Sequence, residues 1–188
     1  HLFSSAASDV YKRQDVKRIT NESHLPVNLE MAATEEMQKI ATELIPNAVC
    51  LVPEKREERT TEGGLDVITE ENKLKTFLDP IIQKNIRVSL FVSPDISQIE
   101  AAFRVGANII ELNTGTFCDL LIENNKEYLE EFEKLKEAAV YGKTLGLEIH
   151  GGHGLTFDSV KYIASIPEIR ELNIGHFLIS QAVFDGIE

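Results

Sequence analysis

Side chains that could transfer protons or bind phosphate gather at the ends of short apolar segments of this chain. Glu30 lies near the end of one such segment, and Glu111 lies in another, just before Asn113-Thr114-Gly115-Thr116. A third segment runs into His150-Gly151-Gly152-His153-Gly154, and a fourth runs into Asn173-Ile174-Gly175-His176. Carboxylates and imidazoles are common general acids and bases, so Glu30, Glu111 and His153 are candidate catalytic residues.

Glycine-rich loops follow the last two of these segments. Glycine lets a backbone approach a ligand closely, and free N–H groups at the start of a helix bind phosphate. In (β/α)8 barrels the loops after the seventh and eighth strands often form a phosphate site. If two strands precede this chain, the loops that contain Gly154 and Gly175 are those two loops, and we expect phosphate there.

Six predicted strands position these residues, and a helix is predicted after each. Parallel strands with right-handed crossovers follow from this alternation, in either a doubly wound sheet or a barrel. A closed (β/α)8 barrel takes about 250 residues, so the chain would hold about six of its eight strand–helix units. The strands are expected over residues 27–31, 48–52, 88–92, 109–112, 148–150 and 171–174.

The helices are predicted from apolar residues that recur on one face and from their capping residues. Thr34 fits an N-cap, and Ser93 with Pro94 fits the N-cap and first position of another helix that Gly106 ends. Three more helices are expected from about Lys126 to Leu145, near Thr156 and from about His176. The expected apolar faces contain Met37, Ile40, Ala41 and Leu44 in the first helix, Leu74, Phe77, Leu78, Ile81 and Ile82 in the second, and Ile99, Ala102 and Phe103 in the third.

Composition excludes several classes of partner. The net charge is −12, which opposes non-specific binding to nucleic acid or to an anionic membrane. No apolar run approaches the length of about 20 residues that a membrane span needs. Cys50 and Cys118 have no disulfide or metal-binding spacing, so we expect a cytoplasmic protein. Residues 1–14 resemble a translated sequencing adapter, which leaves residues 15–188 as one partial barrel domain.

Each candidate also has a structural interpretation. Glu30 alone could be a cap or an ion-pair residue, and Glu111 could pair with Lys55 or Arg56. A glycine cluster can be only a tight turn.

Two other functions are also compatible with these residues. His150, His153 and Glu111 could bind a metal, as in a metal-dependent barrel hydrolase or aldolase. A phosphate-binding remnant without catalysis is a further alternative.

Several segments together resemble the pyridoxine 5′-phosphate synthase family of the deoxyxylulose-phosphate-dependent route to vitamin B6. The resemblance runs from about Asp15 to the end of the chain. It implies a (β/α)8 TIM barrel that assembles as a homo-octamer and needs no metal or organic cofactor. The segments are Asn28-Leu29-Glu30-Met31, Leu51-Val52-Pro53-Glu54-Lys55-Arg56, residues 60–66 (TTEGGLD), Gly152-His153-Gly154-Leu155 and Leu172-Asn173-Ile174-Gly175-His176.

The resemblance also implies a reaction and residue roles. The reaction is a transferase condensation of 3-amino-2-oxopropyl phosphate with 1-deoxy-D-xylulose 5-phosphate, which releases inorganic phosphate and water. By resemblance, Glu30 is a proton acceptor, His153 a proton donor, and Glu111 a transition-state stabiliser. The substrate contacts implied are Thr60 to deoxyxylulose phosphate, and Gly154, Gly175 and His176 to the aminoketone phosphate.

The chain departs from the family pattern in two respects. Family members carry an Asn, a second acid–base His and a His-x-Arg motif on two strands that nothing here matches. The chain is therefore expected to be a fragment without the first two barrel units, inactive by itself. Asn113 and Ser180-Gln181 also differ from the usual family residues, so substrate contacts near them are less well defined.

Overall fold

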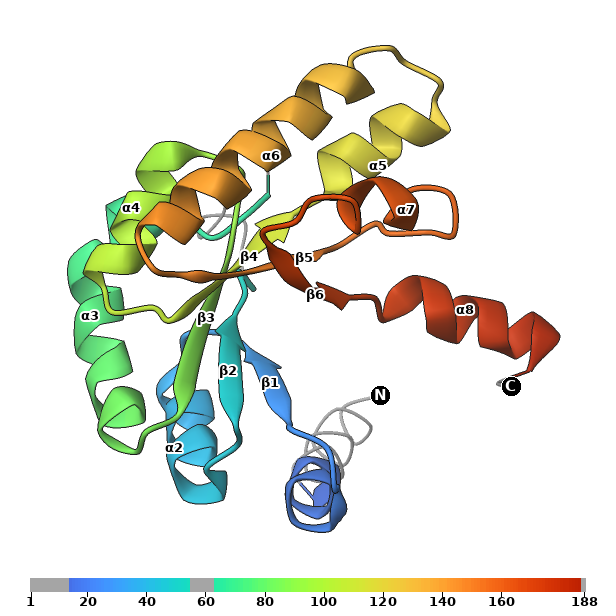
Figure 1. Ribbon diagram of the computed structural model, residues 1–188. Helices are drawn as coiled ribbons and strands as arrows, with labels where there is room; N and C mark the ends of the chain where they lie inside the picture. Colours follow the sequence, from blue (N-terminus) through green and yellow to red (C-terminus); the bar gives the residue numbers. More distant parts are fainter. Residues whose placement is uncertain (1–13, 55–62, 187–188) are drawn as a thin grey trace, which may run out of the picture.

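The computed structural model describes residues 14–54 and 63–186 and shows a single curled sheet with helices on its outer side (Figure 1). All strand pairs are parallel, and the order of the strands in the sheet follows their order in the chain. The strands are β1 (Asn28–Met31), β2 (Ala48–Leu51), β3 (Arg87–Val92), β4 (Ile109–Asn113), β5 (Glu148–Gly152) and β6 (Ile169–Asn173).

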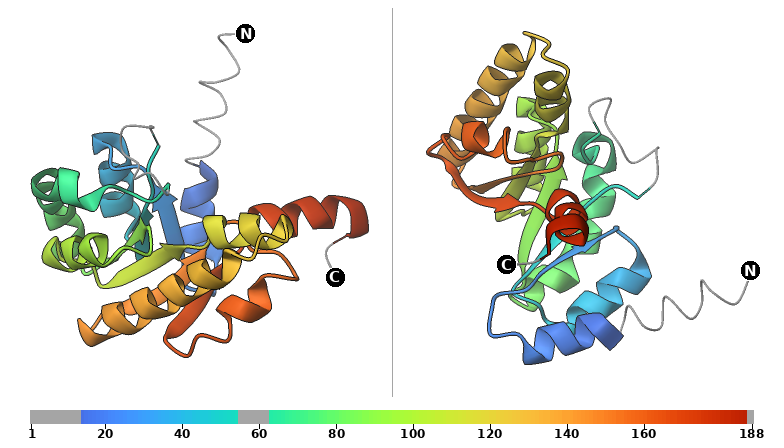
Figure 2. Two further views of the ribbon diagram at one scale, coloured as in Figure 1. Left: turned by 90° about the horizontal axis from the view of Figure 1, so that it is seen from above. Right: turned by 90° about the vertical axis from the view of Figure 1, so that its right-hand side faces the viewer.

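This strand order selects between the two architectures that the sequence allows. A doubly wound sheet reverses its strand order at a switch point, whereas a barrel adds each strand beside the previous one. The described strands run from β1 to β6 without reversal, and Figure 2 shows the sheet curling around its inner face. The fold is therefore α/β, with six strand–helix units of a (β/α)8 TIM barrel, as predicted.

Helices cover the outer face of the sheet, and their ends follow the local sequence. Thr34 caps α2 by accepting a hydrogen bond from the Met37 backbone N–H at 3.3 Å, as predicted. Gly106 and Gly146 follow α4 and α6 with φ of +94° and +85°, a conformation that glycine adopts easily. The named helices are α2 (Glu35–Leu44), α3 (Val67–Gln83), α4 (Ile96–Arg104), α5 (Gly115–Ile122), α6 (Tyr128–Thr144), α7 (Val160–Ile163) and α8 (His176–Asp185); residues 14–22 are also helical.

The two faces of the sheet differ in chemistry because side chains alternate along each strand. Residues such as Leu90, Ile110 and Ile149 pack against the helices and are fully buried. Residues between them, such as Glu111 and His150, project from the opposite, inner face. The apolar core therefore lies between sheet and helices, and the polar groups remain available at the barrel interior.

Three helix boundaries differ from the prediction. The α4 N-cap is Asp95 rather than Ser93, because the Asp95 carboxylate accepts hydrogen bonds from the backbone N–H groups of two residues in the first turn. The helix expected near Thr156 begins only at Val160, because Thr156 and Ser159 bond to each other in a turn. The helix expected over 126–145 is α6, two residues shorter at its start and one at its end.

Two helices were not predicted, residues 14–22 and α5, and two residues assigned to apolar faces are more exposed than expected. The helix α5 is short and apolar on most sides, so it lacks the amphipathic period that indicates a surface helix. Ile82 is 39% exposed and Phe103 is 49% exposed. The apolar face of each of these helices was thus predicted correctly, but the face includes fewer buried residues than predicted.

The last helix, α8, is different from the others. It extends away from the sheet (Figures 1 and 2), and none of its residues is buried. Val183 and Phe184 are 77% and 86% exposed. None of the described helices is long and apolar enough to cross a bilayer.

Candidate active site

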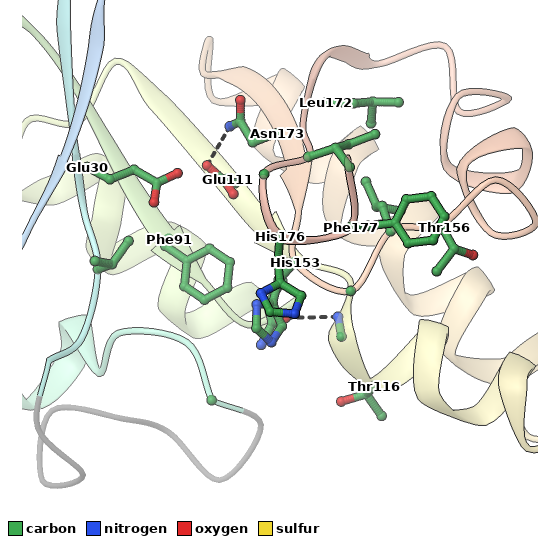
Figure 3. Close-up of a pocket in the computed structure, with 18 of the residues that line it drawn as sticks. Glu30, Phe91, Glu111, Thr116, His153, Thr156, Leu172, Asn173, His176 and Phe177 are labelled. Atoms are coloured by element: carbon green, nitrogen blue, oxygen red, sulfur yellow. Dashed lines mark hydrogen bonds between the residues drawn. The ribbon is translucent and has the colours of Figure 1, made fainter. Parts of the chain in front are cut away.

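A cavity of about 1100 Å³ opens at the carboxyl ends of the strands, where barrel proteins carry their chemistry (Figure 3). Strands β1 and β4 and the loops after β5 and β6 all contribute to its wall. Thr60, the other predicted contact, lies outside the described residues. Six predicted site residues line this cavity: Glu30, Glu111, His153, Gly154, Gly175 and His176.

Glu111 is the most enclosed ionisable group of the cavity, with 4% of its surface exposed. Its Oε2 atom accepts a hydrogen bond from Asn173 Nδ2 at 2.6 Å, and Cys50 Sγ lies 3.6 Å from the same oxygen. The predicted alternative, an ion pair with Lys55 or Arg56, falls outside the described residues. The carboxylate is thus held by one amide and one thiol.

The pKa of Glu111 is raised to about 7, mainly because burial disfavours the charged form. The hydrogen bond from Asn173 opposes this rise, and the negative charge of Glu30 adds to it. Burial also raises the pKa of the Cys50 thiol well above its ordinary value, so Cys50 stays protonated as a donor. Glu111 is therefore able to gain or lose a proton near neutral pH, as a general acid or base requires.

The raised pKa of Glu111 predicts how the stability of the protein changes with pH. Between pH 4.5 and about 7 the folded protein holds a proton on Glu111 that the unfolded chain releases, so the unfolding free energy must fall as the pH rises. Glu111→Gln removes this dependence. Between pH 5 and 8, the wild type should lose about 2.5 kcal/mol more stability than the variant, with other groups cancelling in the comparison. Denaturant unfolding at both pH values measures this, and equal losses in the two proteins would contradict it.

His153 directly follows the carboxyl end of β5 and has a strained backbone conformation. Its φ is +77°, in the left-handed region that non-glycine residues rarely adopt. Thr114, fully buried, fixes this turn: its Oγ1 donates to the His153 carbonyl at 2.6 Å and its N–H donates to the Gly152 carbonyl at 2.8 Å. The imidazole meets the Phe91 ring edge-on, with centroids 6.1 Å apart. The backbone strain and its restraint aim the imidazole into the cavity.

The two glycine loops have room for an anion. Gly154 has a φ of +76°, which continues the left-handed turn begun at His153. Gly175 is the N-cap of α8, where no side chain caps the helix, and within the described part of the chain no atom beyond its neighbours along the backbone lies within 4 Å of the position a Cβ would take. Free N–H groups at the start of α8 therefore face open space beside His176, which suits a phosphate group.

Sequence reasoning missed several residues on which the site depends. Asn173 was noted only as part of a motif, and its bond to Glu111 has no signal in a single sequence. Gly115 leaves space for the His153 ring, because a Cβ there would lie 2.7 Å from His153 Cδ2. Thr114 was seen as a loop residue, and its buried role depends on β5 lying beside β4.

The metal-binding alternative is not supported by the geometry. His150 is buried beneath the cavity, with Nε2 2.8 Å from Glu148 and Nδ1 3.4 Å from Glu171. His153 instead points into the cavity. Within residues 14–54 and 63–186, no three His, Cys, Asp or Glu side chains come together as a metal site.

A curled parallel sheet with a cavity lined by carboxylate and imidazole side chains at its carboxyl edge defines a protein of the β/α-barrel class. The sequence model of the family "Pyridoxal phosphate biosynthesis protein PdxJ" matches residues 10–188. The chain belongs to this family.

Curated relatives support this assignment. The pyridoxine 5′-phosphate synthase of Ruegeria pomeroyi is 54% identical over 164 residues, which cover 87% of this chain and 66% of that protein. The synthases of Roseobacter denitrificans and a Sulfurihydrogenibium species are 51% and 52% identical, covering 93% and 88% of this chain and 70% and 67% of theirs. The chain thus spans about two thirds of the length of these relatives.

Among solved structures, a xylose isomerase domain protein from Planctomyces limnophilus superposes with a TM-score of 0.49 at 15% identity. That match covers 80% of this chain and 62% of the other. A likeness at this level adds nothing to the assignment of fold or function.

Proposed function

We propose that the protein is a pyridoxine 5′-phosphate synthase, a transferase that condenses 3-amino-2-oxopropyl phosphate with 1-deoxy-D-xylulose 5-phosphate. The products are pyridoxine 5′-phosphate, inorganic phosphate and water. The observation that carries the proposal is one cavity that combines Glu30, Glu111 and His153 with the open start of α8. Relatives about 50% identical bear the name of this activity.

The reaction needs several proton transfers, which suit three ionisable groups in one cavity. Amine addition, loss of water and ring closure each move protons at neighbouring atoms of the condensing substrates. From the family resemblance we assign Glu30 as proton acceptor and His153 as proton donor, and both side chains project into the cavity (Figure 3). Glu111 lies deeper, where its ionisable carboxylate can stabilise positive charge that develops in the transition state.

The phosphate groups are assigned to the glycine loops. Gly154, Gly175 and His176 would bind the aminoketone phosphate, where the start of α8 supplies N–H groups and a favourable dipole. This local site offsets the net charge of −12, which opposes anionic ligands in general. We further assign Thr60 a contact to deoxyxylulose phosphate, from the family resemblance.

We also propose that turnover requires more than the groups described here. The described sheet ends in the two edge strands β1 and β6, and a closed (β/α)8 barrel has no edges. The exposed apolar residues of α8 are consistent with burial against further barrel units or against another subunit of a homo-oligomer. In this proposal residues 1–14 are a non-native segment and residues 15–188 are part of one cytoplasmic barrel domain.

The test is product formation from the two phosphorylated substrates. We expect the chain by itself to be inactive. A chimera in which the first two barrel units of the Ruegeria pomeroyi synthase precede residue 15 should form pyridoxine 5′-phosphate and release phosphate. Product is measured by chromatography and phosphate by a colorimetric assay. A chimera that is folded but forms no product would contradict the proposal, and inhibition by chelators would favour the metal-dependent alternative.

A pair of variants tests the phosphate loop within the same assay. In the chimera, Gly175→Asp places a carboxylate at the start of α8 and should raise the KM for the aminoketone phosphate at least about 10-fold by charge repulsion. Gly175→Asn has nearly the same shape without the charge and serves as the control. Equal KM values for the two variants would contradict phosphate binding at this loop.

A further inference from the structure

Glu111 is held by an amide that lies two strands away from it. Asn113, Gly152 and Asn173 are neighbours in register on β4, β5 and β6, and Glu111 precedes Asn113 by two residues on the same face. The Glu111 side chain crosses β5 at Gly152, and its Oε2 atom accepts the bond from Asn173 Nδ2 at 2.6 Å (Figure 3).

This crossing is possible only because residue 152 has no side chain. A Cβ at Gly152 would lie 2.1 Å from Glu111 Oε1 and 3.2 Å from Asn173 Cβ. The carboxylate and the amide therefore occupy the space above Gly152, where the bond between them forms.

The charges around Glu111 oppose its ionised form. Two further carboxylates, Glu30 on β1 and Glu171 on β6, add negative charge at the site. His150 is in register with Glu111 on β5, but its imidazole is turned to Glu148 and Glu171. Among the ion pairs of the described residues, none joins a Lys or Arg to Glu111. Apart from the longer contact with the Cys50 thiol on β2, the Asn173 amide is the group that favours the carboxylate.

We propose that Asn173 is a positioning residue for the reaction, which turns the Glu111 carboxylate across β5 into the cavity and stabilises its ionised form. The proposal rests on the proposed function in that Glu111 takes part in the condensation. Asn173 also lies two residues before Gly175, so the strand that carries this amide continues directly into the proposed phosphate loop. One short segment would then hold both the substrate phosphate and the proton-transfer group.

A direct titration tests the link between the two residues without relying on turnover. The side-chain carboxyl carbons of glutamate are labelled with ¹³C in this chain, and the Glu111 signal is assigned as the one missing in Glu111→Gln. In Asn173→Leu the titration midpoint of Glu111 should rise by about one pH unit, because a hydrogen bond to the charged form is lost. In Asn173→Asp the shape is kept, and the midpoint should rise at least as far, since a second carboxylate replaces the donor.

The control is an amide with a structural role at the opposite end of the sheet. Asn108 accepts a hydrogen bond from the Val88 backbone N–H at 3.0 Å, so Asn108→Ala should lower the unfolding midpoint but leave the Glu111 titration unchanged. An unmoved Glu111 midpoint in both Asn173 variants would overturn the proposal. If Asn173→Leu does not fold, the isosteric Asn173→Asp decides.

The chimera then tests whether this positioning matters for the reaction. Its pH–rate profile should have an acidic limb, and in Asn173→Asp the midpoint of that limb should rise by as many pH units as the Glu111 titration midpoint does. If the Glu111 midpoint rises but the acidic limb stays where it is, the catalytic part of the proposal is overturned. Absence of product from the unsubstituted chimera would be a failure of the proposed function, and the titration would still decide whether Asn173 controls Glu111.

Discussion

His153→Asn and Glu30→Gln should each lower turnover by at least about 100-fold, the usual effect of losing a general acid or base. Both side chains project into the cavity, and neither substitution removes a hydrogen bond found among the described residues. Asn and Gln keep the approximate size and polarity of the original side chains but cannot transfer a proton near neutral pH. The fold should therefore persist while the chemistry is lost.

The measurement is kcat in the chimera that supplies the remaining barrel units, with thermal unfolding recorded beside it. His24→Asn and Glu43→Gln make the same chemical changes at exposed positions outside the cavity and should leave kcat unchanged. Turnover like that of the wild type in His153→Asn or in Glu30→Gln would remove that residue from the proposed mechanism. An unfolding midpoint that falls together with kcat would instead indicate a structural role.

Gly152→Ala should be nearly as damaging, although it changes no ionisable group. Its new methyl group would lie 2.1 Å from Glu111 Oε1, so the carboxylate must leave its position and lose its bond to Asn173. We expect kcat to fall by about 100-fold, comparable with the loss of a charge-stabilising group. The ¹³C titration of Glu111 should change as well, because the displaced carboxylate has new surroundings.

The matched control is the neighbouring glycine on the same strand. Gly151 faces the helices rather than the cavity, and a Cβ there would meet Ile163 Cγ2 at 3.3 Å, a tight contact with a side chain at a buried position. Gly151→Ala should therefore cost some stability but little turnover. If the two alanine variants had the same kcat, the crossing of Glu111 over β5 would not be needed for the reaction.

The local sequence determined most of the elements of this fold. The apolar segments became the six strands, within one residue of the predicted ends at β1 to β4 and within two at β5 and β6, because continuous burial between helices and barrel interior requires such segments. Thr34 and Gly106 marked helix ends correctly, since capping depends on a few adjacent residues. The local sequence did not predict α5, because this helix is buried on several sides. It also favoured Ser93 as the N-cap of α4, whereas Asp95 is the N-cap in the structure.

The sequence also predicted which residues gather at the candidate site. Carboxyl ends of parallel strands meet at one edge of a sheet, so residues at strand ends were expected to share a cavity, and Glu30, Glu111, His153 and His176 do. The motifs also indicated the family, which the comparisons confirm over residues 10–188.

Only the tertiary structure decided the order of the strands and the contacts between side chains from different strands. Whether the sheet was doubly wound or barrel-like depended on which strands pair, and the alternation of elements is the same in both. The bond between Asn173 and Glu111 joins residues 62 positions apart, and the bond from Thr114 to the His153 carbonyl joins residues 39 positions apart. Such contacts leave no local pattern, because they depend on the register between strands rather than on the residues adjacent in the chain.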